Sequence, residues 1–113
     1  MPVYRFGDVV LVDFPFSDRK ADKRRPGLVI AQDPHGDLLV ARITSKKAEL
    51  PTDVPMAEWQ SAGLNIPSTI RLLKMATTHE SFVLRRLGRA SGSDRRAVFE
   101  AFRGFLTELE RAD

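Results

Sequence analysis

The apolar positions in the first half of the chain come in short runs of β-branched and aromatic residues, which predicts strands rather than helices. Three such strands are expected, at residues 9–14, 27–31 and 38–44. The turn-forming sequence at residues 33–37 lies between the second and third strands, so these two are expected to form an antiparallel hairpin. Three consecutive strands joined in this way indicate a meander.

The middle of the chain adds two more strands and a short helix. The strands are predicted at residues 68–75 and 82–87, separated by a polar corner at residues 76–80. The helix is expected at residues 55–62, because Asp53 can cap its start and a glycine follows its end.

Apolar residues near the end of the chain recur at intervals of three and four, which is typical of an amphipathic helix. The residues of this stripe are Val98, Phe99, Phe102, Phe105, Leu106 and Leu109. The Ser-Gly-Ser-Asp sequence at residues 91–94 offers side-chain oxygens that can cap the helix. We expect the stripe to pack against the core or against a second copy of the chain.

Together these elements predict a mainly β fold with α, a short, twisted antiparallel barrel with a long C-terminal helix across it. No repeat, low-complexity tract or linker divides the 113 residues, so we expect a single domain spanning residues 1–113. Trp59, the only tryptophan, is expected to pack onto the barrel, with base stacking as the alternative.

The composition is that of an ordinary globular protein and narrows the chemistry. The sequence has no cysteine and two histidines, so no disulfide, thiol nucleophile or structural zinc site is expected. It has neither an apolar run near the roughly 20 residues of a membrane span nor a signal-peptide core, so we expect a cytoplasmic protein with no membrane contact. The net charge is only +3, but the cations are clustered, which favours polyanions as ligands. The alternative for each cluster is a solvated surface.

Two of these clusters lie beside predicted strand ends and are candidates for phosphate binding. Arg24–Arg25 comes directly before the proline that starts the second strand, and the third strand ends in Thr44–Ser45, followed by Lys46–Lys47. A guanidinium donates in a planar fork that suits a phosphate, and a hydroxyl can hold the same group. The combination suits a phosphodiester. Taken alone, Thr44 would be a strand-end threonine bonded to nearby backbone.

Four sequence blocks in a fixed order resemble the MazF/PemK family of toxins from bacterial toxin–antitoxin pairs. The blocks are GDVVLVDFPF, KRRPGLVIA, ARITSKKAELPTDVP and PSTIRLLKMATTHESFVLRRLGRAS, and they reach from Gly7 to the C-terminal helix. The resemblance implies an SH3-like or CcdB-like barrel, a homodimer, and a sequence-selective endoribonuclease that cuts single-stranded RNA without metal or cofactor. It also implies a MazE-like antitoxin whose acidic, disordered tail lies in the RNA groove.

By position within these motifs, the family's active-site arginine falls on Arg25 and its active-site threonine on Thr44. The chain departs from the family at residues 76–79, where Ala-Thr-Thr-His stands in place of the Arg-Thr-Ile-Asp of some members. His79 is a candidate for part of the missing role, because its pKa range suits proton transfer near neutrality. The alternative is that this corner only shapes the groove and that His79 is a solvated turn residue.

RNA cleavage of this kind uses the neighbouring 2′-hydroxyl as nucleophile and gives a 2′,3′-cyclic phosphate and a 5′-hydroxyl. Arg25 is expected to stabilise the phosphorane, and Thr44 to hold the scissile phosphate in line. The expected contacts to flanking phosphates are Arg24, Ser45, Lys46 and Lys47. The residues that can stack on or read bases are Phe14, Phe16 and Gln32, with core packing as the alternative for the phenylalanines.

Two other functions stay open on the sequence. One is a gyrase-poisoning toxin on the same barrel, as in CcdB. Arg25 and Thr44 argue against it, because a protein that acts by blocking a topoisomerase does not need a pair of phosphate-binding residues. The other is a non-catalytic RNA-binding or structural barrel, which the altered corner at residues 76–79 favours.

Overall fold

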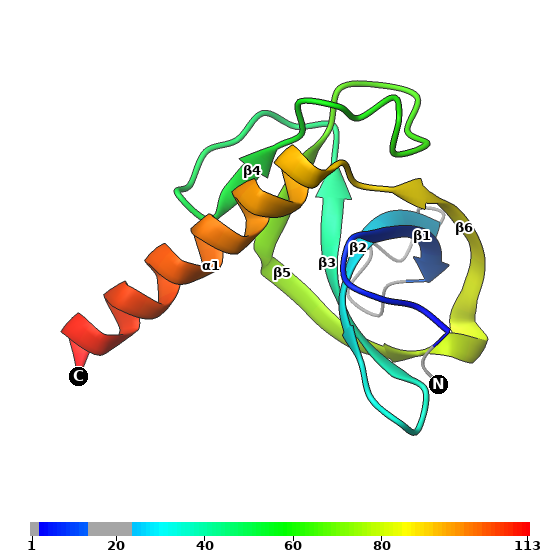
Figure 1. Ribbon diagram of the computed structural model, residues 1–113, viewed down its shortest axis with the longest axis horizontal. Helices are drawn as coiled ribbons and strands as arrows, with labels where there is room; N and C mark the ends of the chain where they lie inside the picture. Colours follow the sequence, from blue (N-terminus) through cyan, green and yellow to red (C-terminus); the bar gives the residue numbers. More distant parts are fainter. Residues whose placement is uncertain (1–2, 14–23) are drawn as a thin grey trace.

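A six-stranded antiparallel sheet and a long C-terminal helix form the part of the chain that the computed structural model describes, residues 3–13 and 24–113 (Figure 1). The strands are β1 (Asp8–Asp13), β2 (Arg24–Gln32), β3 (Asp37–Thr44), β4 (Asp53–Pro55), β5 (Thr69–His79) and β6 (Val83–Arg89). The helices are the 3-10 helix η1 (Glu80–Phe82) and α1 (Gly92–Ala112). The order across the sheet is β4-β5-β3-β2-β1-β6. The predicted mainly β fold with a C-terminal helix is confirmed.

The first three strands form the predicted meander. β1 pairs antiparallel with β2, and β2 pairs antiparallel with β3. β2 begins at Arg24 rather than Gly27, because the residues before Gly27 continue the pairing with β1 as far as Asp13. The arginine pair therefore lies within a strand, where the sheet holds its backbone. Phe14 and Phe16, which were candidates for base contacts, lie outside the described residues.

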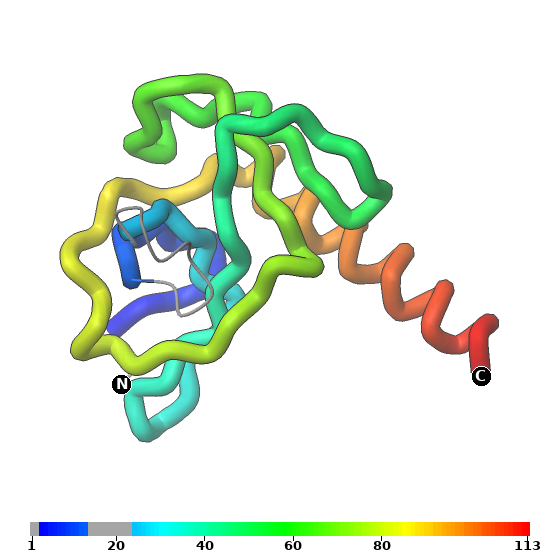
Figure 2. The backbone as a smooth tube through the Cα atoms, turned by 180° about the vertical axis from the view of Figure 1, so that it is seen from behind, coloured from blue at the N-terminus to red at the C-terminus, as the bar shows by residue number. Residues whose placement is uncertain are grey.

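The sheet curls around a core of aliphatic side chains (Figures 1 and 2). Its two ends approach each other where the turns after β4 meet β6. A Cβ atom at Gly63 would overlap the carbonyl group of Leu87, and one at Gly88 would lie 2.5 Å from the carbonyl oxygen of Ala62. Gly63 also has a φ of +89°, which side-chain-bearing residues rarely adopt. Glycine at both positions thus allows the backbone contact that closes the barrel.

The helix predicted at residues 55–62 is wrong, because residues 57–63 form turns. Asp53 is the reason. Instead of capping a helix, it lies in β4, and its carboxylate accepts hydrogen bonds from the backbone N–H groups of Glu49 and Leu50, at 2.9 and 3.0 Å. The turns still pack Trp59 against the hydrophobic core, so its predicted packing role is confirmed.

β5 is longer than the predicted strand, because it continues through residues 76–79, where the sequence predicts a polar corner. These residues keep their pairing with β3 as far as the partners Asp37 and His79. The chain turns only at η1, where the His79 side chain accepts a hydrogen bond from the backbone N–H of Ser81.

α1 packs on the barrel with its first turns only. Ser91 caps it as predicted, since its Oγ accepts a hydrogen bond from the backbone N–H of Asp94 at 3.1 Å. Val98 is fully buried, whereas Leu106 and Leu109 are exposed where the helix extends beyond the sheet (Figure 1). Core packing is confirmed for Val98 and Phe102, whereas Phe99 is exposed, and dimer packing of the remainder stays a prediction. Over residues 3–13 and 24–113, no helix combines the length and apolarity needed to cross a membrane.

Candidate active site

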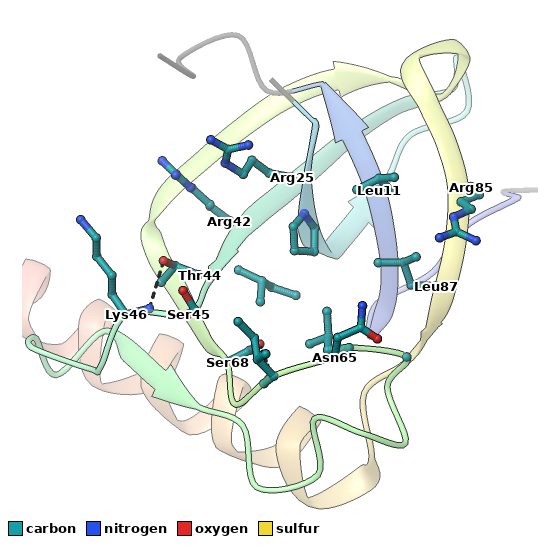
Figure 3. A pocket seen from close by; sticks show the side chains of 15 residues that line it. Leu11, Arg25, Arg42, Thr44, Ser45, Lys46, Asn65, Ser68, Arg85 and Leu87 are labelled. Carbon is teal, nitrogen blue, oxygen red and sulfur yellow. Dashed lines mark hydrogen bonds between the residues drawn. The ribbon is translucent and has the colours of Figure 1, made fainter. Parts of the chain in front are cut away.

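An open pocket of about 590 Å³ lies where the start of β2 and the end of β3 face β6 and the loop before β5 (Figure 3). Its charged and polar lining residues are Arg25, Arg42, Thr44, Ser45, Lys46, Asn65, Ser68 and Arg85. Its other lining residues are Leu11, Pro26, Ile43, Gly63, Leu64, Ile66 and Leu87. None of the described lining residues is acidic, so the pocket is cationic. Within the same described ranges, no group of three His, Cys, Asp or Glu side chains could hold a metal ion.

The sheet register brings Arg25 and Thr44 to this pocket. Gly27 of β2 pairs with Arg42 of β3, and Arg25 and Thr44 each lie two residues beyond this pair, toward the same end of the two strands. Both residues line the pocket, and Ser45 follows at the end of the strand. Two segments that are well separated in the sequence thus supply a guanidinium and a hydroxyl to one cavity.

The Thr44 side chain is already oriented by the backbone. Its Oγ1 accepts a hydrogen bond from the backbone N–H of Lys46 at 3.2 Å (Figure 3). This is the local backbone bond that was the alternative to a role in the site. Because the oxygen is the acceptor, its O–H hydrogen can still be donated to an anion. The backbone bond and a role in the site are therefore compatible.

Arg42 is a lining residue that the sequence analysis did not select. Burial lowers its pKa, and the positive charges of Arg25 and Arg71 lower that pKa further. Its Nε atom is buried without a hydrogen-bond partner in the described structure. Figure 3 shows the Arg42 and Arg25 side chains beside each other on one side of the pocket. Positive charge is thus concentrated beside Thr44.

Arg71, the partner of Arg42 on β5, is paired with a carboxylate and does not line the pocket. Its Nε lies 3.6 Å from Oδ1 of Asp53 on β4. Burial acts to raise the pKa of Asp53, but the backbone N–H groups of Glu49 and Leu50 together with the Arg71 charge outweigh it, and the pKa is lowered. The carboxylate stays ionised and ties Arg71 to the β4 edge of the sheet.

Sequence reasoning also missed Asn65, Ser68 and Arg85. Asn65 and Ser68 belong to the loop before β5, and the path of that loop depends on turns that the sequence pattern did not reveal. Arg85 stands in a visible cationic cluster, but β6 has two irregularities in its pairing with β1, around Leu11. Strand alternation therefore could not tell which arginine of the cluster faces the pocket.

His79 does not lie in this pocket. It pairs with Asp37 at the opposite end of β3 from Thr44. Its Nδ1 lies 2.9 Å from Oγ of Ser81, and its Nε2 lies 3.2 Å from the carbonyl oxygen of His35. The ring thus contacts the turn between β2 and β3, and the structure does not bring it together with the predicted arginine and threonine.

Three other predicted substrate contacts also lie outside the pocket lining. The Gln32 side chain accepts a hydrogen bond from the backbone N–H of Tyr4 and donates one to Oε1 of Glu80, both at 2.8 Å. Its amide is therefore used within the protein. Arg24 and Lys47 are exposed, each next in sequence to a lining residue.

A comparison with models of protein families identifies the family of this chain. A family model described as PemK-like, MazF-like toxin of type II toxin–antitoxin system matches residues 5–106. The chain belongs to this family. The resemblance seen in the four sequence blocks is thereby confirmed. A comparison with curated proteins gave no match.

Solved structures of endoribonucleases and of MazF toxins share the architecture. A mycobacterial endoribonuclease in complex with its cognate antitoxin has a TM-score of 0.75 at 17% identity, over 93% of this chain and 96% of that chain. The Mycobacterium tuberculosis toxin MazF-mt6 has a TM-score of 0.68 at 28% identity, over 83% and 90% of the two chains. MazF from Deinococcus radiodurans has a TM-score of 0.69 at 19% identity, over 95% and 99%. The barrel with its C-terminal helix is thus a MazF toxin fold.

Proposed function

We propose that this PemK/MazF toxin is an endoribonuclease that cleaves single-stranded mRNA sequence-selectively, without a metal ion or cofactor. The observation that carries the proposal is the presence of Arg25 and Thr44 in one cationic pocket. Membership of the toxin family supports it, as does the likeness to chains named endoribonucleases.

In the proposed reaction the 2′-oxygen of a ribose attacks the adjacent phosphorus, and the bond from phosphorus to the 5′-oxygen breaks. The products are a 2′,3′-cyclic phosphate and a 5′-hydroxyl. Arg25 donates hydrogen bonds to the non-bridging oxygens and stabilises the charge of the phosphorane. Thr44 donates its hydroxyl to the same phosphate and holds it in line for the attack.

Proton transfer in this scheme involves solvent. The described lining residues include no carboxylate and no imidazole. In the proposed scheme the proton of the 2′-hydroxyl leaves to water, and the 5′-oxygen takes a proton from water. Under this proposal the pocket accelerates the reaction by charge stabilisation and positioning rather than by an acid–base pair.

The rest of the cationic surface binds the strand on either side of the scissile link. Lys46 and Ser45 line the pocket, and Arg24 and Lys47 are exposed beside it. We assign these four residues to flanking phosphates. We also assign Asn65, which lines the pocket and whose amide both donates and accepts, to a contact with a base or a ribose.

We also propose that the toxin acts in the cytoplasm as a homodimer of one-domain subunits and is neutralised by a MazE-like antitoxin. The support is that similar structures are an endoribonuclease in complex with its cognate antitoxin and a MazE–MazF complex. An acidic antitoxin segment would compete with RNA for the same positive charge.

The test is incubation of pure, folded protein with a mixed RNA in the presence of EDTA. Cleavage with cyclic phosphate and 5′-hydroxyl ends is expected. Intact RNA that is nevertheless bound would favour the non-catalytic RNA-binding barrel, the function that the altered corner at residues 76–79 favours. Stalled gyrase complexes in a parallel topoisomerase assay would favour the gyrase-poisoning toxin.

A further inference from the structure

We propose that Arg42 and Arg25 form a two-arginine clamp, in which guanidinium groups from β3 and β2 bind one phosphate between them. The phosphate is that of the scissile link, so this identification rests on the proposed function. Arg42 was not among the residues that the family resemblance implied.

The sheet geometry supports the clamp. Arg42 lies two residues before Thr44 on β3, and side chains two apart on a strand share a face. The register places Gly27, which has no side chain, opposite Arg42, so the direct partner of Arg42 on β2 puts no side chain between it and Arg25. All three functional side chains line the pocket (Figure 3). One anion can therefore be within reach of both guanidinium groups and the hydroxyl.

The charges around Arg42 favour the binding of an anion. The groups that perturb its pKa besides burial are the cations Arg25 and Arg71. Arg71 is paired with Asp53, but no carboxylate in the described ranges pairs with Arg42. Its Nε is a buried donor without an acceptor among those residues. A partly buried cation beside another cation costs free energy that a bound phosphate would offset.

A surface arginine would differ in two respects. Arg103 on α1 is largely exposed and has its own carboxylate, Glu100, at 2.9 Å. Arg42 has neither the exposure of its Nε nor the partner. Removing the Arg42 charge should therefore not destabilise the empty protein, whereas it should weaken phosphate binding.

The test measures thermal unfolding midpoints while inorganic phosphate is titrated at constant ionic strength. Phosphate should raise the midpoint of the wild type. In Arg42→Gln the midpoint without phosphate should be unchanged or higher, and the phosphate Kd should rise about 10- to 100-fold, the range expected for a lost charge-assisted hydrogen bond. Arg42→Lys should give an intermediate Kd, because it keeps the charge without the planar fork. Arg103→Gln is the matched control and should behave as the wild type.

A second arm uses a 2′-deoxy oligonucleotide, which presents the phosphodiester but cannot be cleaved. The Kd of this oligonucleotide should rise in Arg42→Gln by a similar factor. If the substitution raises the Kd of inorganic phosphate but not that of the oligonucleotide, the clamp binds a free phosphate instead. Wild-type phosphate affinity in both Arg42 variants would overturn the clamp, as would a lower midpoint of Arg42→Gln without ligand. If the wild type fails to cleave RNA but binds phosphate through Arg42, the clamp stands and the ribonuclease proposal fails.

Discussion

Arg25 lies at the start of a strand, where its side chain lines a pocket and its backbone pairs with Val12 of β1. Truncating it to alanine should leave the barrel folded, because the side chain contributes little to the core. RNA cleavage should fall by at least 100-fold, the typical loss when one transition-state donor is removed. A cleavage assay combined with circular dichroism checks both parts. Arg103→Ala is the control, and an unfolded Arg25→Ala protein would show that the arginine is structural.

His79 is expected to matter little for the chemistry, because its ring contacts Ser81 and the carbonyl oxygen of His35 rather than the pocket. His79→Gln keeps a donor and an acceptor at that place and should cleave RNA within a few-fold of the wild-type rate. Its pH–rate profile should match that of the wild type between pH 5 and 8, where a catalytic histidine would titrate. A large loss of rate together with a lost inflection would instead give His79 a catalytic role.

Some residues of the candidate site could be predicted from the sequence and others could not, depending on where they lie in their strands. Arg25 and Thr44 stand at strand ends, where motif and chemistry coincide. Arg42 stands inside a strand, where alternation of polar and apolar residues makes it look like an ordinary solvent-facing cation. Only the pairing with β2 and β5 shows that it is partly enclosed between two other arginines.

The edge pair β4–β5 depends on the ionised carboxylate of Asp53. Asp53→Ala should lower the free energy of unfolding at pH 7 by about 1–3 kcal/mol, because the backbone N–H groups of Glu49 and Leu50 lose their acceptor. The folded-state pKa of Asp53 is lowered, so its stabilising effect is full above the unfolded-state pKa of about 3.9 and is lost as the pH falls through the folded-state value.

Urea unfolding at pH 7 and at several pH values below 4 checks this prediction. The wild type should lose its advantage over Asp53→Ala as the solution is acidified. Glu108→Ala, which removes an exposed carboxylate from α1, is the control and should differ little from the wild type at any pH. If the difference in the free energy of unfolding between wild type and Asp53→Ala stays constant down to pH 2, the ionised carboxylate is not the source of the stabilisation.

Elements were predictable where the pattern is local. The strands of the meander and the capped helix α1 follow from periodicity and turn residues within a few positions. The helix at residues 55–62 failed because the oxygen that could have capped it is bound to the preceding loop. β5 exceeded its prediction because pairing with β3, a distant segment, keeps its polar end extended.

For the whole molecule, the net charge of +3 understates the field that RNA would meet, because the pocket gathers cations and no described lining residue is acidic. Changing Lys46 and Lys47 together to alanine should weaken RNA binding at low salt. It should also reduce the slope of log K against log salt by about 0.7 for each lysine that contacts a single-stranded phosphate. Binding measured over a salt series checks this, and an unchanged slope would remove both residues from the interface.

The closure of the barrel was not predictable from the sequence. Gly63 is recognisable as a stop signal, but its contact with Leu87 joins two segments with no pattern in common. The contact also anchors the start of the loop that carries Leu64, Asn65 and Ile66 to the pocket wall. Leu64 packs against the hydrophobic core, whereas Asn65 and Ile66 are exposed, so these two side chains can be exchanged without moving the anchored backbone. Under the proposed function, substitutions at these positions would change the target sequence of related toxins, while the catalytic residues on β2 and β3 stay unchanged.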